Sequence, residues 1–252
     1  MYTKFEISNI LKKQYNKFNA DYEIFGIFLY GSQNYNLATS KSDIDTKMII
    51  IPSLENLVFD KPVSKTVLFP WGECDIKDVR EMIKSYKKQN VNFIETLFTD
   101  YYYINPIYIH FFDELLSKRE EIAHYDEHKA LDCFNGLMMQ AKKRLTKPTE
   151  ATKEDIIRYG YRPKSLMNIY KYAAMAEKYI NGANYKAVLQ SEKCKIFRKK
   201  KYDKDKVLQL VEQLNEKTKN LILNTVPKAI NKELSIWLDT WIITLIGFYI
   251  GI

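Results

Sequence analysis

Two short polar motifs lie close together near the start of the chain. The first is Gly31-Ser32, and the second is Asp43-Ile44-Asp45, which follows after ten intervening residues. Side chains alternate across an extended strand, so Asp43 and Asp45 are expected on one face and Ile44 on the other. Two neighbouring carboxylates repel each other unless a cation neutralises them, and Mg²⁺ prefers carboxylate oxygens and shares its coordination shell with substrate phosphates. The acidic pair therefore predicts a Mg²⁺ site.

The Gly31-Ser32 motif predicts a phosphate-binding turn. Gly31 permits a backbone conformation that a side chain would block, and it lets a ligand approach the backbone closely. Ser32 is a favourable first residue for a helix, so a short helix is expected to begin there, with N–H groups exposed for a phosphate. The alternative interpretation is that Asp43 and Asp45 are solvated carboxylates that turn the chain at the start of a strand.

Apolar segments on both sides of the motifs predict the strands that position them. Residues 25–30 precede the motifs and residues 48–51 follow them, and each run is short, apolar and bounded by polar residues. Such runs are typical of buried strands. Further along, the segments 64–69 and 73–77 flank Pro70-Trp71-Gly72, which predicts a β-hairpin.

The rest of the chain is predicted to be helical, because apolar residues recur at intervals of three and four. These helices cover residues 7–19, 79–88, 90–98, 130–145, 156–180, 207–223 and 230–250. Strands in the first half and helices in the second indicate an α+β fold with two domains. We expect a catalytic domain over residues 1–125 and a helical domain over residues 126–252.

The spacing of the two motifs resembles the signature of nucleotidyltransferases of the DNA polymerase β superfamily. It is more similar still to a bacterial and phage branch described as predicted nucleotidyltransferases. The motif of that branch reads roughly Gly-Ser-x-x-x-Gly-Leu-x-x-x-x-Ser-Asp-x-Asp, and Leu37, Ser42, Asp43 and Asp45 match it. Asn36 stands where the family has Gly, but Asn tolerates a left-handed backbone, so the turn is expected to survive.

This resemblance implies a polymerase β-like nucleotidyltransferase domain, a mixed sheet flanked by helices, followed by a helical domain. It also implies a third carboxylate on a neighbouring strand, for which Asp75 is the candidate and Glu73, on the same face, is the rival. The segment 90–98 is similar to a family segment that ends Glu-x-Leu-Phe, which favours Asp75. Glu95 in that segment and Ser42 would orient the residues that bind the ligands. The alternative is that Glu95 is a carboxylate on a helix surface. Superfamily members use two Mg²⁺ ions about 3.5–4 Å apart to hold the attacking and leaving oxygens, and Mn²⁺ is a substitute.

The helical half also contains a segment that resembles a pattern of this family. Residues 161–171 resemble a pattern written Lys-x-x-x-His-x-x-Arg, in which Lys164 matches, Asn168 replaces His and Lys171 replaces Arg. The spacing places the three on one helix face. The resemblance implies that Lys164 and Lys171 help Gly31 and Ser32 to bind the triphosphate, although lysine lacks the two-pronged phosphate contact of arginine.

The composition is that of a folded, basic protein. The 252 residues are 46% hydrophobic and carry a net charge of +8, which favours binding to polyanions. Eight lysine and arginine residues fall within the segment 193–206. This basic run predicts either an RNA or DNA contact or a solvated loop, and Phe197 and Tyr202 within it could stack on bases or pack in the core.

Three further features bear on the location of the protein. Cys74, Cys133 and Cys194 show no metal-type spacing, which indicates a reducing cytoplasmic setting. Residues 1–6 lack the apolar stretch of a signal peptide. The apolar run 240–250 is shorter than the roughly 17–25 residues of a spanning helix, so we expect a buried final helix and no membrane partner. A membrane anchor or an oligomer contact is the alternative.

Together these features predict a cytoplasmic, Mg²⁺-dependent nucleotidyltransferase. It would transfer a nucleoside monophosphate from a nucleoside triphosphate, foremost ATP, to an acceptor hydroxyl and release pyrophosphate. Rival enzymes are an RNA or DNA terminal nucleotidyltransferase and a toxin-like enzyme that modifies tRNA or protein. A rival of another class is a nucleotide- or nucleic-acid-binding module without catalysis. The sequence leaves the acceptor and the oligomeric state open.

Overall fold

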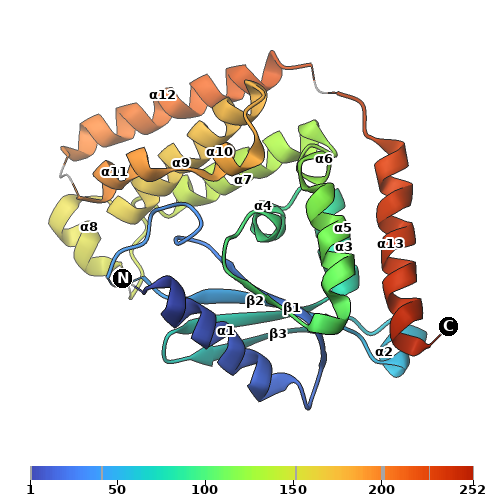
Figure 1. The fold of residues 1–252 in the computed structure, drawn as a ribbon. Coiled ribbons are helices and arrows are strands. Elements are labelled where there is room, and N and C mark those ends of the chain that lie inside the picture. Colours follow the sequence, from blue (N-terminus) through green and yellow to red (C-terminus); the bar gives the residue numbers. More distant parts are fainter. Residues whose placement is uncertain (1, 41, 151, 200–201, 227, 252) are drawn as a thin grey trace. The chain divides into compact units, whose positions relative to one another are not determined.

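The computed structural model describes residues 2–40, 42–150, 152–199, 202–226 and 228–251, and Figure 1 shows its ribbon. The fold is α+β, as predicted. The chain divides into a sheet unit, formed by Met1–Asn34, Ala38–Asp126 and Ala229–Ile252, and a helical unit, formed by Tyr35–Leu37 and Glu127–Lys228.

A mixed five-stranded sheet forms the centre of the sheet unit. Its strands are β1 (Glu23–Tyr30), β2 (Asp45–Ile51), β3 (Ser64–Phe69), β4 (Gly72–Asp78) and β5 (Tyr102–Ile104). They lie in the order β3-β4-β2-β1-β5, in which β2 and β4 run parallel and the other neighbours run antiparallel. The predicted strands and the predicted β3–β4 hairpin are confirmed. The short β5 was not predicted, because three residues are too few to show a pattern.

Helices cover both faces of this sheet. The helices of the sheet unit are α1 (Lys4–Phe18), α2 (Leu54–Val58), α3 (Val79–Lys87), α4 (Val91–Ile94), α5 (Ile109–Ser117), α6 (Arg119–Ala123) and α13 (Lys232–Ile250), with 3₁₀ turns at Glu95–Leu97 and Pro106–Tyr108. On one face, α1 buries Ile7 and Leu11 in a cluster with Ile27 and Leu29 of β1. On the other face, the ring of Phe28 packs against Phe112 of α5.

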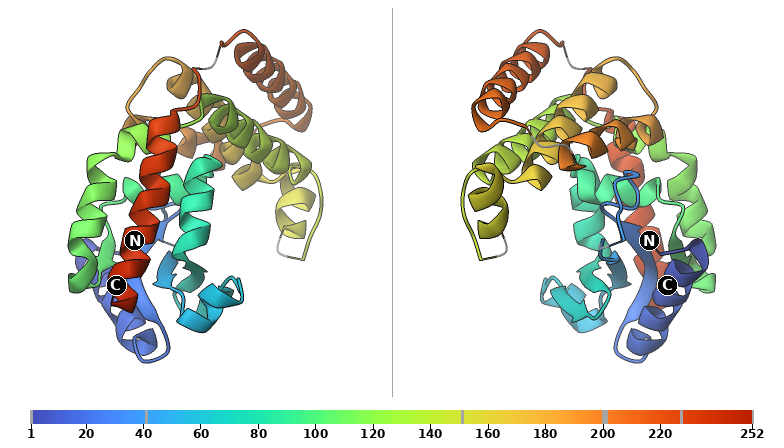
Figure 2. Two further views of the ribbon diagram at one scale, coloured as in Figure 1. Left: turned by 90° about the vertical axis from the view of Figure 1, so that its right-hand side faces the viewer. Right: turned by 90° about the vertical axis from the view of Figure 1, so that its left-hand side faces the viewer.

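The final helix α13 belongs to the sheet unit, which corrects its predicted place in a helical domain of residues 126–252. It lies beside α3 and α5 (Figure 2). Trp241 Nε1 donates to the carbonyl oxygen of Phe111 (3.1 Å), and Lys87 forms an ion pair with Asp239 (2.6 Å). These contacts join segments far apart in sequence, so no local pattern could reveal them.

The same helix is buried along one side only, which corrects the expectation of a buried final helix. Leu238 and Leu245 face the sheet unit, whereas Ile236 and Ile243 are 67% and 70% exposed. The helix begins eight residues before the apolar run and spans 19 residues, so by length and composition alone it could cross a membrane. The expectation that it is too short to span is therefore wrong.

The helical unit is built on three long helices that run side by side in Figure 1. Its elements are α7 (Glu127–Lys143), α8 (Lys153–Tyr159), α9 (Pro163–Ile180), α10 (Tyr185–Leu189), a 3₁₀ turn at Glu192–Lys195, α11 (Ile196–Lys199) and α12 (Lys204–Leu223). The predicted helix over 156–180 is two helices. Gly160 ends α8 in a left-handed conformation, and Pro163 begins α9, which is the usual asymmetry of glycine and proline at helix ends.

Candidate functional site

Pairing of β1 with β2 brings the two sequence motifs together. Tyr30, the last residue of β1, is the cross-strand partner of Asp45, the first residue of β2. Gly31 follows directly and has a left-handed backbone (φ 86°). A Cβ atom on Gly31 would have one neighbour within 4 Å, the Oδ2 atom of Asp45 at 4.0 Å. The glycine therefore leaves open space beside an acidic side chain.

The segment after Gly31 is a series of turns and not a helix, so the prediction that a helix begins at Ser32 is wrong. The N–H of Asn34 donates to the carbonyl of Gly31 (3.0 Å), and its side-chain Nδ2 donates to the carbonyl of Leu29 (3.0 Å). Asn36 is left-handed (φ 55°), as expected of the residue that replaces the family's glycine. A left-handed residue stops helical propagation. A turn therefore stands where the sequence predicts the start of a helix.

The turn is held by Glu95, whose side chain is fully buried. Its Oε2 atom accepts hydrogen bonds from the N–H of Gly31 (3.1 Å) and from Nδ2 of Asn34 (3.1 Å). Thr99 Oγ1 donates to the other end of the Asn34 amide (2.8 Å). Glu95 is therefore not on a helix surface. A buried oxygen that accepts from two donors holds the turn in one conformation.

Substitution of Glu95 by Gln is expected to lower the free energy of unfolding by about 1–3 kcal/mol, because it alters a buried carboxyl group whose oxygen accepts from two donors. Chemical denaturation measures this loss. Glu114→Gln makes the same change on an exposed position of α5 and should have little effect. Equal stability of the two variants would show that Glu95 does not hold the turn.

The parallel pairing of β2 with β4 places further charged residues on the same sheet face. Thr46 pairs with Cys74 and Lys47 with Asp75. Asp45 and Glu73, the residues before Thr46 and Cys74, therefore lie beside each other on neighbouring strands. The N–H of Glu73 donates to Asp45 Oδ1 (3.4 Å).

Lys47 and Asp75 form a salt bridge within this face. Lys47 Nζ lies 2.8 Å from Asp75 Oδ2, with side-chain exposures of 3% and 18%. A second lysine, Lys77, contacts the other oxygen of Asp75 (3.1 Å). The Lys47 ammonium also lies 4.3 Å from the ring centroid of Phe93 and 4.8 Å from that of Tyr30. Lys47 was not predicted as a site residue, although a lysine two residues after Asp45 in a buried strand was a visible signal.

Tyr30 connects to the same face through its hydroxyl group, which donates to Oε1 of Glu73 (2.7 Å). Burial raises the pKa of the Tyr30 phenol far above its usual range, and the hydrogen bond to Glu73 and the nearby carboxylates add to the shift. Tyr30 therefore remains a hydrogen-bond donor at neutral pH. Burial also raises the pKa of the Cys74 thiol to about 11, so this thiol stays protonated and is a poor metal ligand.

The structure does not gather the predicted carboxylates into a cluster of three. Within the described ranges, no group of three or more His, Cys, Asp and Glu side chains could hold a metal ion. Asp43 is exposed and Asp45 is partly buried, whereas Asp75 is engaged by lysines. The hydroxyl of Ser42, the residue before Asp43, accepts a hydrogen bond from the N–H of Thr39 (2.8 Å). This bond closes a turn directly before the acidic motif.

Lys164 and Lys171 belong to the helical unit and differ in environment. Lys164 is exposed, but Lys171 is only 5% exposed. Its ammonium lies 3.9 Å from the ring centroid of Tyr35 and 4.2 Å from that of Tyr172. The carbonyl of Tyr35 also accepts from the N–H of Ser191 (3.3 Å). These contacts bind the segment Tyr35–Leu37, three residues after Ser32, to the helical unit.

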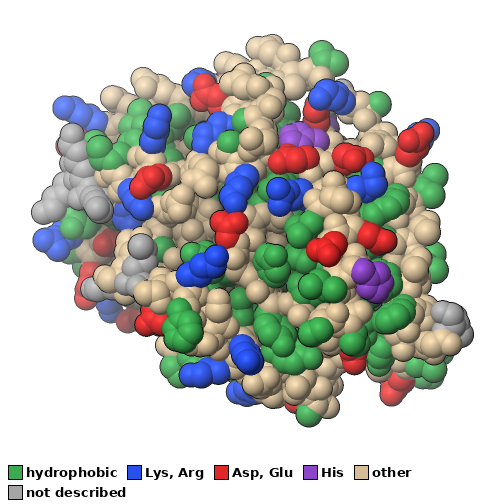
Figure 3. Space-filling view, viewed as in Figure 1, with side chains coloured by type: hydrophobic (Ala, Val, Ile, Leu, Met, Phe, Trp, Pro, Cys, Tyr) green, Lys and Arg blue, Asp and Glu red, His purple; other side chains and the backbone are tan. Residues whose placement is uncertain are grey.

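The basic run lies partly outside the described residues, since Lys200 and Lys201 are not described. The rings of Phe197 and Tyr170 are stacked, with their centroids 3.6 Å apart. Phe197 and Tyr202 pack against the core of the helical unit. This packing agrees with the core alternative for these aromatic residues. On the face shown in Figure 3, lysine and arginine side chains are interspersed with acidic ones.

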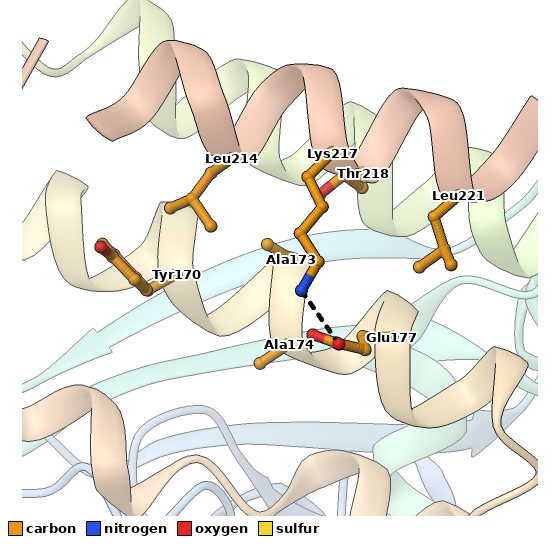
Figure 4. Close-up of a pocket in the computed structure, with 8 residues that line it drawn as sticks. All are labelled: Tyr170, Ala173, Ala174, Glu177, Leu214, Lys217, Thr218 and Leu221. Atoms are coloured by element: carbon orange, nitrogen blue, oxygen red, sulfur yellow. Dashed lines mark hydrogen bonds and ion pairs between the residues drawn. The ribbon is translucent and has the colours of Figure 1, made fainter. Parts of the chain in front are cut away.

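A cavity of about 230 Å³ lies between α9 and α12 in the helical unit. Its lining is mostly apolar and includes Ala173, Ala174 and Leu214. Lys217 reaches from α12 to Glu177 of α9 (3.0 Å), as Figure 4 shows. None of the predicted site residues lines this cavity.

No protein-family model matches this chain, and no curated protein matches it. Its function is therefore inferred from its own residues and contacts.

Proposed function

We propose that the protein is a cytoplasmic, Mg²⁺-dependent nucleotidyltransferase. The observation that carries the proposal is the pairing of Tyr30 with Asp45, which sets the Gly31 turn beside the acidic pair. A glycine turn next to carboxylates suits a metal–nucleotide complex, because the cation must contact both partners.

Support for a divalent cation comes from the donor chemistry, because carboxylate oxygens are the ligands that Mg²⁺ prefers. Asp43 and Asp45 offer carboxylate oxygens, and the space that a Cβ atom would fill at Gly31 adjoins Asp45 Oδ2. Asp43 and Asp45 would hold the ion or ions, Mg²⁺ or Mn²⁺, with a third carboxylate on β4, for which the sequence favours Asp75. When bound, the cation neutralises the triphosphate and makes the acceptor hydroxyl easier to deprotonate.

The remaining residues would position the nucleoside triphosphate, foremost ATP. Gly31 gives the phosphates access to the turn, and Ser32 offers its amide and hydroxyl to the β- and γ-phosphates. Glu95 keeps the turn in shape. The protein's contribution is then positioning and charge stabilisation, which dominate catalysis of phosphoryl chemistry.

The acceptor can be found by following a label. We would incubate the protein with Mg²⁺, each nucleoside triphosphate labelled at its α-phosphate and a total cell lysate, and then separate RNA, protein and small molecules. Label in one fraction identifies the acceptor class and distinguishes a terminal transferase from a protein- or tRNA-modifying enzyme. Nucleotide binding without transfer to any fraction would favour the non-catalytic binding module.

An RNA or DNA acceptor is a second candidate because of the basic run. If Lys199, Lys200 and Lys201 contact phosphates, their replacement by Ser should weaken RNA binding and flatten its salt dependence by up to about three units of log–log slope, since each neutralised phosphate releases about one counterion. Gel-shift titrations at two salt concentrations measure the slope. Nucleotide affinity should not change, and a wild-type protein that binds no RNA at low salt would rule out this acceptor.

A further inference from the structure

We infer that the exposed face of α13 binds α13 of a second copy of this chain, so that the protein forms a twofold-symmetric dimer in which the two helices run parallel. The inference is independent of the proposed function, because it uses no residue of the Gly31 turn or of the acidic pair.

The side of α13 that faces away from the sheet unit carries a regular apolar stripe. Three isoleucines seven residues apart are exposed along it, namely Ile236, Ile243 and Ile250. The smaller residues Thr240 and Gly247 lie between them, the first exposed and the second half-buried. The intervals between the five residues alternate between four and three, which is the spacing of the seam between two packed helices. An identical helix in register therefore meets this stripe along its whole length.

The helices on either side of α13 carry opposite charges. Figure 2 shows α13 between α3 and α5. Helix α3 and the residue after it carry Lys84, Lys87 and Lys88, whereas α5 carries Asp113 and Glu114. Complementary charges around an apolar contact select the partner and its orientation. A second copy supplies both signs, as a self-complementary interface requires.

Both flanking helices are anchored near the middle of α13. Lys87 of α3 forms an ion pair with Asp239 (2.6 Å), and the carbonyl oxygen of Phe111 in α5 accepts a hydrogen bond from Trp241 (3.1 Å). The two anchored residues of α13 are two positions apart, about 3 Å along the helix. The charged residues one turn from these anchors therefore also lie near the middle of α13.

These charges favour the parallel orientation. A twofold axis along α13 preserves heights and places α3 of one copy against α5 of the other, so that Lys84 faces Glu114 of the second copy. A twofold axis across α13 would instead place α3 against α3, with lysine facing lysine. Like charges across an interface are unfavourable, so the second arrangement is the weaker one.

A membrane surface is the other candidate occupant of an apolar helix face, and the charges disfavour it. Helices that lie on membranes are rich in lysine and arginine on their polar side. Helix α13 contains one lysine, Lys232, and two carboxylates, Glu233 and Asp239. The two exposed carboxylates of α5 lie next to it, so anionic lipid would be repelled from this side of the face.

Sedimentation velocity of the full chain over a range of concentrations tests the interface. We expect a dimer with a dissociation constant of about 1 μM or tighter. Ile243→Glu should weaken the dimer by at least about 100-fold, because the carboxylate would be buried in an apolar seam. Ile157→Glu makes the same change on α8, where Ile157 is 84% exposed against 70% for Ile243, and should leave the dimer unchanged. Circular dichroism melts should show both variants folded, since neither position is buried.

Charge reversal tests the orientation. Lys84→Glu and Glu114→Lys should each weaken the dimer by about fivefold, and the double variant should restore it, because the exchange puts opposite charges back across the interface. A tighter dimer on Lys84→Glu alone would show that lysine faces lysine and would overturn the parallel arrangement.

Vesicle flotation separates the dimer from the membrane alternative. The wild type should not float with vesicles of anionic phospholipid. A wild type that is monomeric at every concentration, or a dimer that Ile243→Glu leaves intact, would overturn the inference. A monomer that floats with the vesicles and loses this binding on Ile243→Glu would assign the face to lipid instead.

Discussion

Asp45→Asn is expected to reduce Mg²⁺-dependent pyrophosphate release by at least about 10³-fold, and Asp43→Asn by a similar factor. Each change removes a negative charge that would hold the cation, and the loss of preorganised charge stabilisation costs about 10²–10³ in turnover even for one hydrogen-bond donor. The measurement is a coupled assay of pyrophosphate with each nucleoside triphosphate.

The fold should survive these changes, since Asp43 is exposed and Asp45 is only partly buried. Circular dichroism melts of each variant test this, and Asp113→Asn on the exposed side of α5 is the matched control for both assays. An Asp43→Asn, Asp45→Asn double variant with unchanged turnover would exclude the acidic pair from the reaction.

Gly72→Ala is expected to cause the largest loss of stability, about 2–5 kcal/mol in the free energy of unfolding. The backbone of Gly72 has φ 150°, which side chains disfavour. An added Cβ atom would also lie 2.3 Å from the carbonyl oxygen of Ile44. Because this backbone atom belongs to the residue between Asp43 and Asp45, relief of the clash must displace the acidic pair, so turnover should fall as well.

Gly26→Ala is the matched control for that variant. Its nearest neighbour would be the tip of the Ile104 side chain, at 2.7 Å, which can move aside, so we expect a loss of about 1 kcal/mol, at the low end for an overpacked core. Urea denaturation compares the two variants. A Gly72→Ala protein as stable as Gly26→Ala would contradict the close approach of the hairpin to the acidic motif.

Local patterns predicted most of the sheet and the long helices, because burial imposes a period on each element. The strand that ends at Tyr30 and the hairpin around Pro70-Trp71-Gly72 were both visible as short apolar runs between turn residues. The helix at Ser32 was not formed, although Ser is a good helix start. The hydrogen bonds that Asn34 makes with Glu95 and Leu29 compete with a helix, and one of these partners lies far along the chain.

The site was less predictable because its contacts depend on strand order. Asp75 was favoured by resemblance, but only the parallel pairing of β2 with β4 reveals that Lys47 lies opposite it and that Glu73 adjoins Asp45. Likewise, the place of α13 in the sheet unit follows from the Trp241 contact with Phe111. Long-range pairings of this kind leave no trace in local periodicity.

Comparison of label transfer from the α- and γ-phosphates tests directly whether the protein transfers a nucleoside monophosphate. The protein is incubated with Mg²⁺, cell lysate and a nucleoside triphosphate labelled at one phosphate or the other, with the Asp43→Asn, Asp45→Asn double variant as the blank. We expect α-label to join the acceptor while γ-label leaves as pyrophosphate. Transfer of γ-label to the acceptor, or no difference between the wild type and the double variant, would contradict this expectation.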